Sequence, residues 1–335
     1  MEIALDPRVV PADPPAIETA VHCLAAGGLV AFPTETVYGL GADATNAKAV
    51  ARLYAAKGRP SFNPLIAHVA DAAAARRIAR FTEAAERLAA LWPGPLTLVL
   101  PKTDDCPVAE LATAGLDTIA VRVPGHRAAH DILALFGKPL VAPSANRSGH
   151  VSPTLASHVV ADLDGAVDLV IDGGPAHVGL ESTIVACLGD GPFLLRPGAI
   201  PRATIEQILG SPLHDAPSRA GGAAPQAPGQ LASHYAPRAR LRLDADVVRP
   251  GEALLAFGPM LPPGADAVRV LNLSSRGDLV EAAANLFSHL RALDRSGAGT
   301  IAVMPVPSVG LGEAINDRLA RAAAPRGSTP TGLPA

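Results

Sequence analysis

Short apolar runs alternate with helix-like segments through the first two thirds of this 335-residue chain. The helix-like segments are 16–28, 45–58, 83–94, 126–137 and 202–210, and each ends at a glycine, as helices commonly do. The strand-like segments are 29–33, 63–69, 95–101, 117–124, 138–144, 167–174, 182–188 and 192–198. Because the last three strands follow one another closely, the pattern predicts an α/β fold with a mixed sheet.

A change of composition divides the chain after residue 210. Residues 211–237 are dominated by Pro, Ala, Gly and Ser and have no apolar period, which is typical of a linker. Strand-like segments follow at 238–244, 252–258, 267–273 and 300–307, with helix-like segments at 278–297 and 313–324. We therefore predict a first domain at 1–210, a linker or lid at 211–237, a smaller Rossmann-like α/β domain at 238–325 and a flexible tail at 326–335.

The composition excludes several classes of protein. Hydrophobic residues make up 49% of the chain and charged residues 18%, which supports a sizeable core and argues against global disorder. A net charge of −3 gives no global reason for a nucleic-acid partner, although a local basic patch stays open. The three cysteines are too sparse for a disulfide framework or a zinc ribbon. The chain has neither a secretory signal pattern nor a long apolar run, so we expect a cytoplasmic protein.

Polar side chains cluster where the predicted strands end. The clusters lie at 33–41, 57–63, 118–122, 142–154, 179–185 and 194–198. In α/β sheets, ligands bind where strand ends meet loops. Lys and Arg charges together with hydroxyl and amide donors suit phosphate. The sequence therefore predicts a site for an anionic, phosphorylated small molecule. It has no P-loop and no dinucleotide fingerprint in context, so a nucleotide would bind by a less common architecture.

Each polar residue also has a structural explanation when it is considered alone. Lys57 is explained as a cation at a helix end, Ser152 as a turn former and His68 as a core histidine. Arg122 is harder to explain in this way, because a buried arginine needs a carboxylate or phosphate partner. No GxSxG or HExxH motif supplies a nucleophile or a metal site. The prediction of a ligand site depends on the joint placement of these residues.

Four segments together resemble a known family. They are "PTETVYGLG" (33–41), "KGRPSFNPL" (57–65), "PSANRSG" (143–149) and "SHYAP" (233–237). They resemble the threonylcarbamoyl-AMP synthases of the YrdC-like superfamily, in the long form with an extra C-terminal domain. The family hallmark, K-x-R followed by S-x-N, falls on Lys57, Arg59, Ser144 and Asn146, which we take as the catalytic set.

The resemblance implies a YrdC-like twisted mixed sheet whose helices form a concave basic site. It implies that L-threonine, bicarbonate and ATP give threonylcarbamoyl-AMP and pyrophosphate, for the modification of tRNA next to the anticodon. The implied threonine-binding residues are Thr36, His68, Arg122, Ala142 through its backbone, and Ser182. The implied ATP-binding residues are Arg59, Asn63, Thr118, Ser144, Ser152, Arg196 and Tyr235.

The resemblance also implies companions for the reaction. Mg²⁺ would be held by the ATP phosphates and not by a protein metal site. Partner proteins would transfer the threonylcarbamoyl group to tRNA, and weak binding of RNA by the chain itself stays open. Two alternatives remain: a carbamoyltransferase-type protein of the same fold, and an RNA-binding YrdC-like protein without nucleotide turnover.

Overall fold

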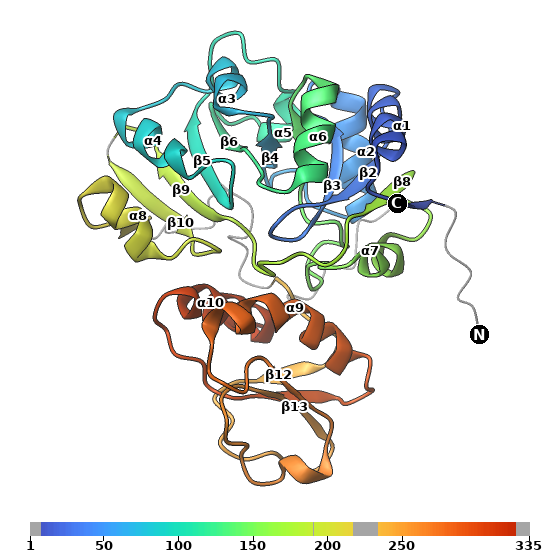
Figure 1. Cartoon of the computed structure of the whole chain (residues 1–335), viewed down its shortest axis with the longest axis vertical. Coiled ribbons are helices and arrows are strands. Elements are labelled where there is room, and N and C mark those ends of the chain that lie inside the picture. Colours follow the sequence, from blue (N-terminus) through green and yellow to red (C-terminus); the bar gives the residue numbers. More distant parts are fainter. Residues whose placement is uncertain (1–7, 190, 217–233, 326–335) are drawn as a thin grey trace, which may run out of the picture.

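The computed structural model describes residues 8–189, 191–216 and 234–325, which form two α/β units, each built on its own sheet (Figure 1). The first sheet has eleven strands in the order β1-β8-β2-β3-β7-β4-β6-β5-β9-β10-β11. Their bounds are β1 (Val9–Pro11), β2 (Val30–Pro33), β3 (Tyr38–Asp43), β4 (Ile66–His68), β5 (Leu96–Pro101), β6 (Thr118–Arg122), β7 (Leu140–Val141), β8 (Leu169–Asp172), β9 (Thr183–Cys187), β10 (Pro192–Arg196) and β11 (His214–Asp215). The helices are α1 (Pro14–Ala25), α2 (Ala47–Lys57), α3 (Ala72–Ile78), α4 (Glu83–Leu88), α5 (Glu110–Thr113), α6 (Arg127–Phe136), α7 (Ala156–Leu163) and α8 (Arg202–Leu209), with a 3₁₀ turn η1 (Ala89–Leu91).

The strands of this sheet run in both directions, which confirms the predicted mixed sheet. Strand β4 runs parallel to β6, and β5 runs parallel to β9, while β5 and β6 are antiparallel. The ends of neighbouring strands therefore bring segments that are far apart in the sequence to one place. His68 on β4, for example, is the register partner of Arg122 on β6.

Side chains alternate between the two faces of the large sheet, and each face has its own core. On β2, Ala31 joins the core that includes α2, α4 and α8, whereas Val30 and Phe32 join the core under α1 and α6. A third, smaller apolar cluster lies over the central strands and consists of Ile66, Val99, Ala120, Ile184, Ala186 and Leu195. Because alternate residues of a strand share a face, this cluster lies on the same face as His68 and Arg122.

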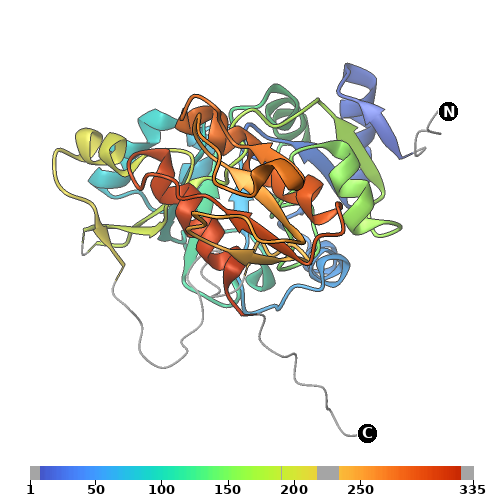
Figure 2. The ribbon, with the colours of Figure 1, turned by 90° about the horizontal axis from the view of Figure 1, so that it is seen from below.

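The second unit is a parallel sheet in the order β12-β15-β13-β14. Its elements are β12 (Arg240–Arg242), β13 (Glu252–Ala256), the 3₁₀ turn η2 (Ala265–Ala267), β14 (Val270–Asn272), α9 (Leu279–Asp294), β15 (Thr300–Val303) and α10 (Leu311–Ala323). Helices α9 and α10 lie between the two sheets, so they form the surface that the second unit presents to the first (Figures 1 and 2).

The two units share one apolar cluster. Val37, Val151 and Leu180 of the first unit are buried together with Leu286 and Phe287 of α9. The Asp162 carboxylate and the Arg291 guanidinium form a mostly buried ion pair across the same interface, with an N···O distance of 2.7 Å. The α9–α10 surface is therefore packed against the end of the large sheet from which several predicted site residues come.

Some predicted elements differ from those observed. The predicted strand 63–69 is ordered as a strand only at Ile66–His68, and 138–144 only at Leu140–Val141. Strand β3 occupies a segment for which the sequence pattern predicts no strand. This strand could not be predicted because it contains Gly39 and Gly41, which have low strand propensity. Close packing against neighbouring residues requires glycine at both positions. A Cβ on Gly41 would lie 2.5 Å from the ring of Phe32, and one on Gly39 would lie 3.2 Å from the Cβ of Ala142.

Two predicted segments extend beyond the part of the chain that the structure describes. Residues 217–233 of the predicted linker and the whole predicted tail at 326–335 lie outside it. The domain boundaries therefore stay a prediction. Among the helices of the described residues, none has the length and apolar character that a membrane span requires.

Candidate active site

Three of the five residues predicted to bind threonine lie around the end of β6. Arg122 is 4% exposed, and its Nη2 donates to the Thr36 hydroxyl at 2.9 Å. His68 lies beside Arg122 on the neighbouring strand. These side chains come from three separate segments of the sequence, and the register of the sheet brings them together.

Ser182 and Ala142 reach the same region by different contacts. The Ser182 hydroxyl is 2.7 Å from that of Thr97 on β5, the strand that pairs with β6. The Ala142 amide donates to the Ile66 carbonyl at 3.3 Å, two residues before His68. All five predicted threonine-binding residues thus come from β4, β6 and the strands and loops next to them.

Arg122 has a carboxylate partner that was not among the predicted site residues. The Glu35 side chain accepts from Arg122 Nη2 at 2.7 Å and from the Gly125 amide at 3.0 Å. Burial acts to raise the pKa of Glu35, but the Arg122 charge and these hydrogen bonds hold it below its usual value. Glu35 is therefore ionised and fixes the guanidinium, while the buried Nε of Arg122 has no hydrogen-bond partner among the described residues. The signal for Glu35 was its place in the segment 33–41.

His68 is a neutral imidazole in this environment. Burial, and then the nearby Arg122 charge, lower its pKa to about 3. Its Nδ1 lies 3.2 Å from the Ile66 carbonyl, which can only accept, so Nδ1 carries the proton. Nε2 is then the unprotonated acceptor, suited to a hydroxyl or ammonium donor.

The hallmark residues form a second group beyond the end of α2. Gly58 takes a left-handed conformation, with φ of 58°, and ends the helix immediately after Lys57. The buried Lys57 ammonium donates to the carbonyl oxygens of Ser144 and Asn146, so it holds the 144–146 segment against the helix end. Burial, and then the charge of Arg59, hold the pKa of Lys57 well below its usual value.

Arg59 folds back onto its own loop. Its Nε donates to the Asn63 carbonyl at 3.3 Å, and its Nη2 donates to the Pro64 carbonyl at 3.0 Å. This loop leads into β4, which pairs with β6 from Ile66 opposite Ala120, and Thr118 begins β6 at the opposite end from Arg122. Four residues along a strand span about 13 Å, so Thr118 and the Arg59 loop lie well apart from Arg122 and His68 along these strands.

The remaining predicted ATP residues lie near the interface between the two units. Arg196 donates to the carbonyl of Ser182 at 2.9 Å and to its hydroxyl at 3.2 Å. The Ser152 hydroxyl donates to the Glu181 carboxylate at 2.6 Å. Glu181 and its partner Arg318 were not predicted. Glu181 lies in a segment that drew attention for its hydroxyl residues, but Arg318 on α10 has no local sequence signal.

Tyr235 has a strained backbone and a buried ring. Its φ is +63°, in the left-handed region that costs a non-glycine residue free energy. The ring stacks on Phe287 with centroids 5.6 Å apart, and the His234 ring packs edge-on at 4.0 Å. The packing of the ring offsets this strain. It also places the Tyr235 hydroxyl near Arg196 and Arg318, where the hydroxyl is fully buried and has no hydrogen-bond partner among the described residues.

Buried polar atoms without a partner concentrate at these residues. Among the described residues there are seven such side-chain atoms, and five belong to Asn63, Arg122, Asn146, His234 and Tyr235. Burying a polar group without a hydrogen bond is costly, so such atoms usually mark a place where a ligand or water binds. The site offers several cations and neutral hydrogen-bond donors beside the apolar cluster that lies over the central strands. This combination suits an anionic substrate.

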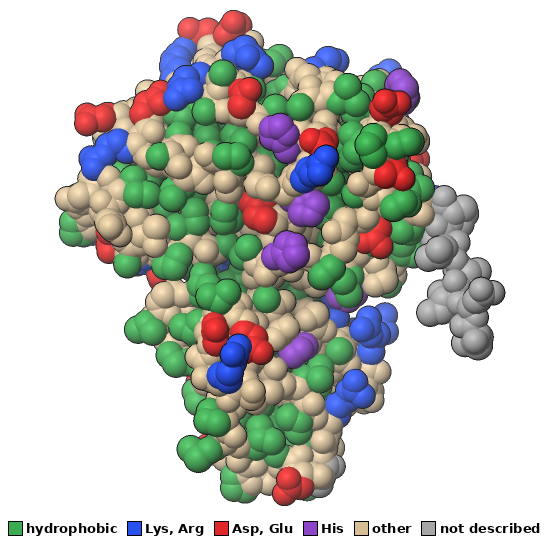
Figure 3. All heavy atoms as spheres, viewed as in Figure 1, with side chains coloured by type: hydrophobic (Ala, Val, Ile, Leu, Met, Phe, Trp, Pro, Cys, Tyr) green, Lys and Arg blue, Asp and Glu red, His purple; other side chains and the backbone are tan. Residues whose placement is uncertain are grey.

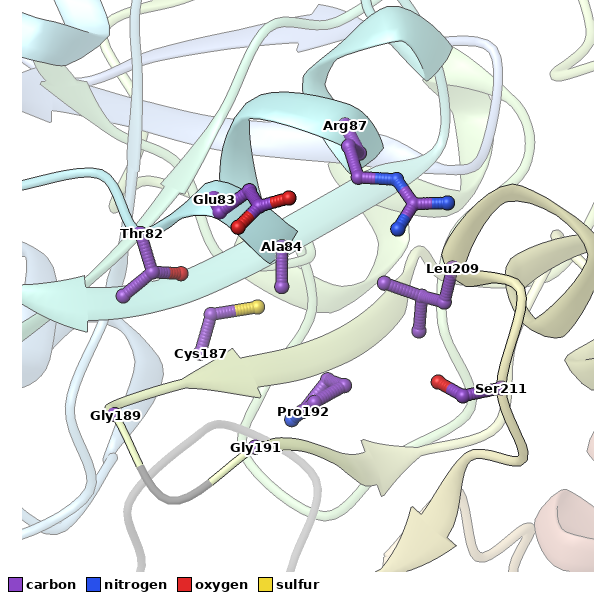
Figure 4. A pocket seen from close by; sticks show the side chains of 10 residues that line it. All are labelled: Thr82, Glu83, Ala84, Arg87, Cys187, Gly189, Gly191, Pro192, Leu209 and Ser211. Carbon is purple, nitrogen blue, oxygen red and sulfur yellow. The ribbon is translucent and has the colours of Figure 1, made fainter.

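Three surface pockets of the structure contain none of the predicted site residues. One, of about 350 Å³, lies between α4, the β9–β10 hairpin and the end of α8 (Figure 4). The others, of about 980 and 690 Å³, involve α6 together with α1 and with α3, respectively. On the face shown in Figure 3, acidic and basic side chains are interspersed and form no large basic patch. The candidate site is thus recognised by its buried polar groups.

Two family models match the chain. One, Sua5_yciO_yrdC, described as "Telomere recombination", matches residues 22–198, and the other, described as "Threonylcarbamoyl-AMP synthase, C-terminal domain", matches residues 200–324. The chain is 42% identical over 322 residues to the threonylcarbamoyl-AMP synthase of Pyrococcus abyssi, covering 91% of this chain and 93% of the relative. The chain belongs to the threonylcarbamoyl-AMP synthase family.

Further relatives agree with this membership. The threonylcarbamoyl-AMP synthase of Bacillus subtilis is 40% identical over 327 residues, covering 93% of this chain and 94% of the relative. The crystal structure of P. abyssi Sua5 complexed with L-threonine superposes with a TM-score of 0.83 at 40% identity, covering 92% of this chain and 94% of that one. The predicted family and fold are therefore confirmed, and the assignment of individual site residues stays a proposal.

Proposed function

We propose that this chain is an L-threonylcarbamoyladenylate synthase, a nucleotidyltransferase that converts L-threonine, bicarbonate and ATP into threonylcarbamoyl-AMP and pyrophosphate. The observation that carries the proposal is the group of buried polar and cationic side chains at the predicted site residues, within a chain that is about 40% identical to synthases over most of its length. The threonine complex of the similar Sua5 supports threonine as one substrate.

The chemistry fits the side chains. The threonine amine forms an N–C bond to CO₂ derived from bicarbonate and loses a proton, which gives a carbamate. A carbamate oxygen then attacks the α-phosphorus of ATP, and the bond from that phosphorus to the pyrophosphate oxygen breaks. Such a sequence needs positioning and charge neutralisation and no protein nucleophile.

The threonine-binding residues receive a zwitterion. Arg122, whose Nε stays available, pairs with the substrate carboxylate. The neutral His68 accepts at Nε2, and the Thr36 and Ser182 hydroxyls can both donate and accept. Together with the Ala142 backbone, these groups would distinguish an amino acid with a hydroxyl from one without.

The nucleotide-binding residues are the predicted ATP set: Arg59, Asn63, Thr118, Ser144, Ser152, Arg196 and Tyr235. Arg59 and Arg196 neutralise phosphate charge, including the charge that builds at the α-phosphorus. Lys57 supports the ATP set by holding Ser144 and Asn146 in place. Among the described residues, no group of three or more His, Cys, Asp or Glu side chains is placed to hold a metal ion, so Mg²⁺ would come bound to the ATP phosphates.

The fate of the product and the proteins that receive it belong to the same proposal. The product is a labile mixed anhydride, so transfer proteins that act on tRNA next to the anticodon must receive it, in the cytoplasm. We consider direct RNA binding a weaker alternative, because the chain has a net charge of −3 and the face in Figure 3 has no large basic patch.

A pyrophosphate-release assay tests the proposal. We expect release from ATP only when threonine and bicarbonate are both present, with threonylcarbamoyl-AMP detected by mass spectrometry. Arg122→Met should raise the KM for threonine by about 100-fold, because a charge-assisted hydrogen bond to the substrate carboxylate is lost. Arg77→Met, which removes an exposed arginine of α3, is the matched control. ATP turnover that does not respond to threonine would favour the carbamoyltransferase-type alternative, and RNA binding without turnover would favour the other.

A further inference from the structure

One arginine of the second unit reaches into the first. Arg318 lies on α10 and is 0% exposed. Its Nε donates to the Glu181 carboxylate at 2.8 Å, and its Nη2 donates to the Pro197 carbonyl at 3.0 Å. The guanidinium also lies 5.2 Å from the centroid of the Tyr235 ring. Apart from its sequence neighbour Asp317, these partners all come from residues outside the second sheet and its helices.

Each of these partners leads directly to a residue of the proposed ATP site. The second oxygen of Glu181 accepts the hydrogen bond from the Ser152 hydroxyl at 2.6 Å. Pro197 follows Arg196 in the chain, so its carbonyl fixes the backbone next to that guanidinium. Tyr235 itself belongs to the proposed ATP site. Arg318 therefore contacts or adjoins three nucleotide-site residues without being one of them.

The electrostatics show why Glu181 needs this partner. Burial acts to raise the pKa of Glu181, but the charge of Arg318, followed by that of Arg196 and the hydrogen bond from Ser152, keeps it below its usual value. Glu181 is therefore ionised and serves Ser152 purely as an acceptor. With Arg318 removed, the carboxylate would be buried with less compensation and would turn toward Arg196 or take up a proton.

A role in stability alone explains these contacts less well. The interface already has an apolar core and the separate Asp162–Arg291 ion pair. A buried ion pair is a poor stabiliser compared with apolar residues of the same volume, because both charges must be desolvated. What the pair does provide is a fixed direction for each hydrogen bond that it makes.

We propose that Arg318 is a positioning residue through which the second domain orders the nucleotide site, by fixing Glu181, and through it the Ser152 hydroxyl, together with the Arg196–Pro197 backbone and the Tyr235 ring. The inference depends on the proposed function for the identity of the ligand. It gives the C-terminal domain a part in ATP binding, with no substrate contact of its own.

The test measures binding of α,β-methylene-ATP and of L-threonine by calorimetry, using the full-length chain. Arg318→Met should weaken binding of the ATP analogue by about tenfold or more, the equivalent of ~1.4 kcal/mol, and change threonine affinity by less than about twofold. Arg318→Lys, which keeps the charge, should restore part of the loss. Glu313→Gln is the matched control, because Glu313 is on the same helix and also pairs across the interface, with Arg202. It should leave both affinities unchanged.

A second variant covers the case in which Arg318→Met does not fold. Arg318→Met combined with Glu181→Leu removes both buried charges, a change that proteins often tolerate. If Arg318 acts by positioning the nucleotide site, this double variant should fold and still bind the ATP analogue about tenfold more weakly than wild type. Binding within twofold of wild type, or an equal loss of threonine affinity, would overturn the proposal.

The outcome also separates this inference from the proposed function. A wild-type chain that binds the ATP analogue but releases no pyrophosphate with threonine and bicarbonate would contradict the function, while the affinities of the variants would still decide the role of Arg318. A wild-type chain that binds no ATP analogue would overturn both.

Discussion

Replacing Gly179 with alanine should push the two units apart. Gly179 has φ of +74°, and a Cβ there would lie 2.4 Å from the Ala283 carbonyl oxygen and 2.6 Å from the Ala284 Cα, both on α9. Ordinary contacts begin near 3.4 Å, so α9 would have to move by about 1 Å. The atoms in the way belong to helix backbone, which cannot rotate aside as a side chain can.

The expected loss of stability in Gly179→Ala is the sum of two separate free-energy costs. A left-handed backbone costs an alanine about 1–2 kcal/mol, part of which is offset by the smaller entropy of the unfolded chain. Overpacking of a well-ordered contact costs about 1–3 kcal/mol more. Gly174→Ala isolates the first cost, because Gly174 has φ of +82° in the same loop and its Cβ would meet nothing within 4 Å. The difference between the two variants should therefore be about 1–3 kcal/mol.

Scanning calorimetry of both variants measures this difference, because it reports unfolding of the two units together. We expect Gly179→Ala to melt at a lower temperature than Gly174→Ala, and its transition to broaden or divide as the units lose their coupling. Affinity for an ATP analogue should fall as well, since Gly179 is two residues before Glu181. Equal losses in the two glycine variants would refute the reasoning, because the clash with α9 would then carry no cost.

Three further predictions concern the site itself. The folded-state pKa of His68 is about 3, so as pH falls from 7 to 5 the unfolded chain gains a proton there that the folded chain does not. Wild type should lose about 2 kcal/mol more stability over that range than His68→Gln, as measured by denaturant titration, and parallel pH profiles would contradict this. Lys57→Met should lower kcat/KM by about 100-fold, because the carbonyls of Ser144 and Asn146 lose their buried donor, whereas Lys48→Met, at an exposed position of the same helix, should have no effect. Glu35→Gln should lower the free energy of unfolding by about 3 kcal/mol at pH 7, since Arg122 would lose its ionised partner, and by less at acidic pH below the lowered pKa of Glu35, where the wild-type carboxylate also takes up a proton.

The large-scale order of the fold could be predicted because it depends on local patterns. Periodicity and helix-ending glycines indicated α2 and α6, and apolar runs indicated β5 and β9. Strand β3 could not be predicted in this way, because its glycines are required by neighbours from β2 and from the segment after β7. That requirement exists only once the strands are side by side.

The residues of the candidate site also fall into those that the local sequence reveals and those that it does not. Arg122 was recognisable because a buried arginine in an apolar strand needs a partner, and the structure supplies Glu35. Glu181 and Arg318 were not recognisable, because they are 137 residues apart in the sequence and acquire meaning only through the contact between them. Sequence reasoning finds residues that are unusual for their element, and it misses residues that are unusual only for their neighbours.

The buried cations explain why a site built in this way should bind a polyanion. Arg122 and Arg318 each have a buried or half-buried carboxylate partner, whereas Lys57 and Arg59 donate to backbone carbonyl oxygens. Burial lowers the pKa of both Lys57 and Arg59, and the charge of Arg59 lowers that of Lys57 further. The free energy that this arrangement costs the folded chain without nucleotide would be recovered when phosphate charge binds beside it. The residues that strain the folded chain are therefore the ones that would give the nucleotide its affinity.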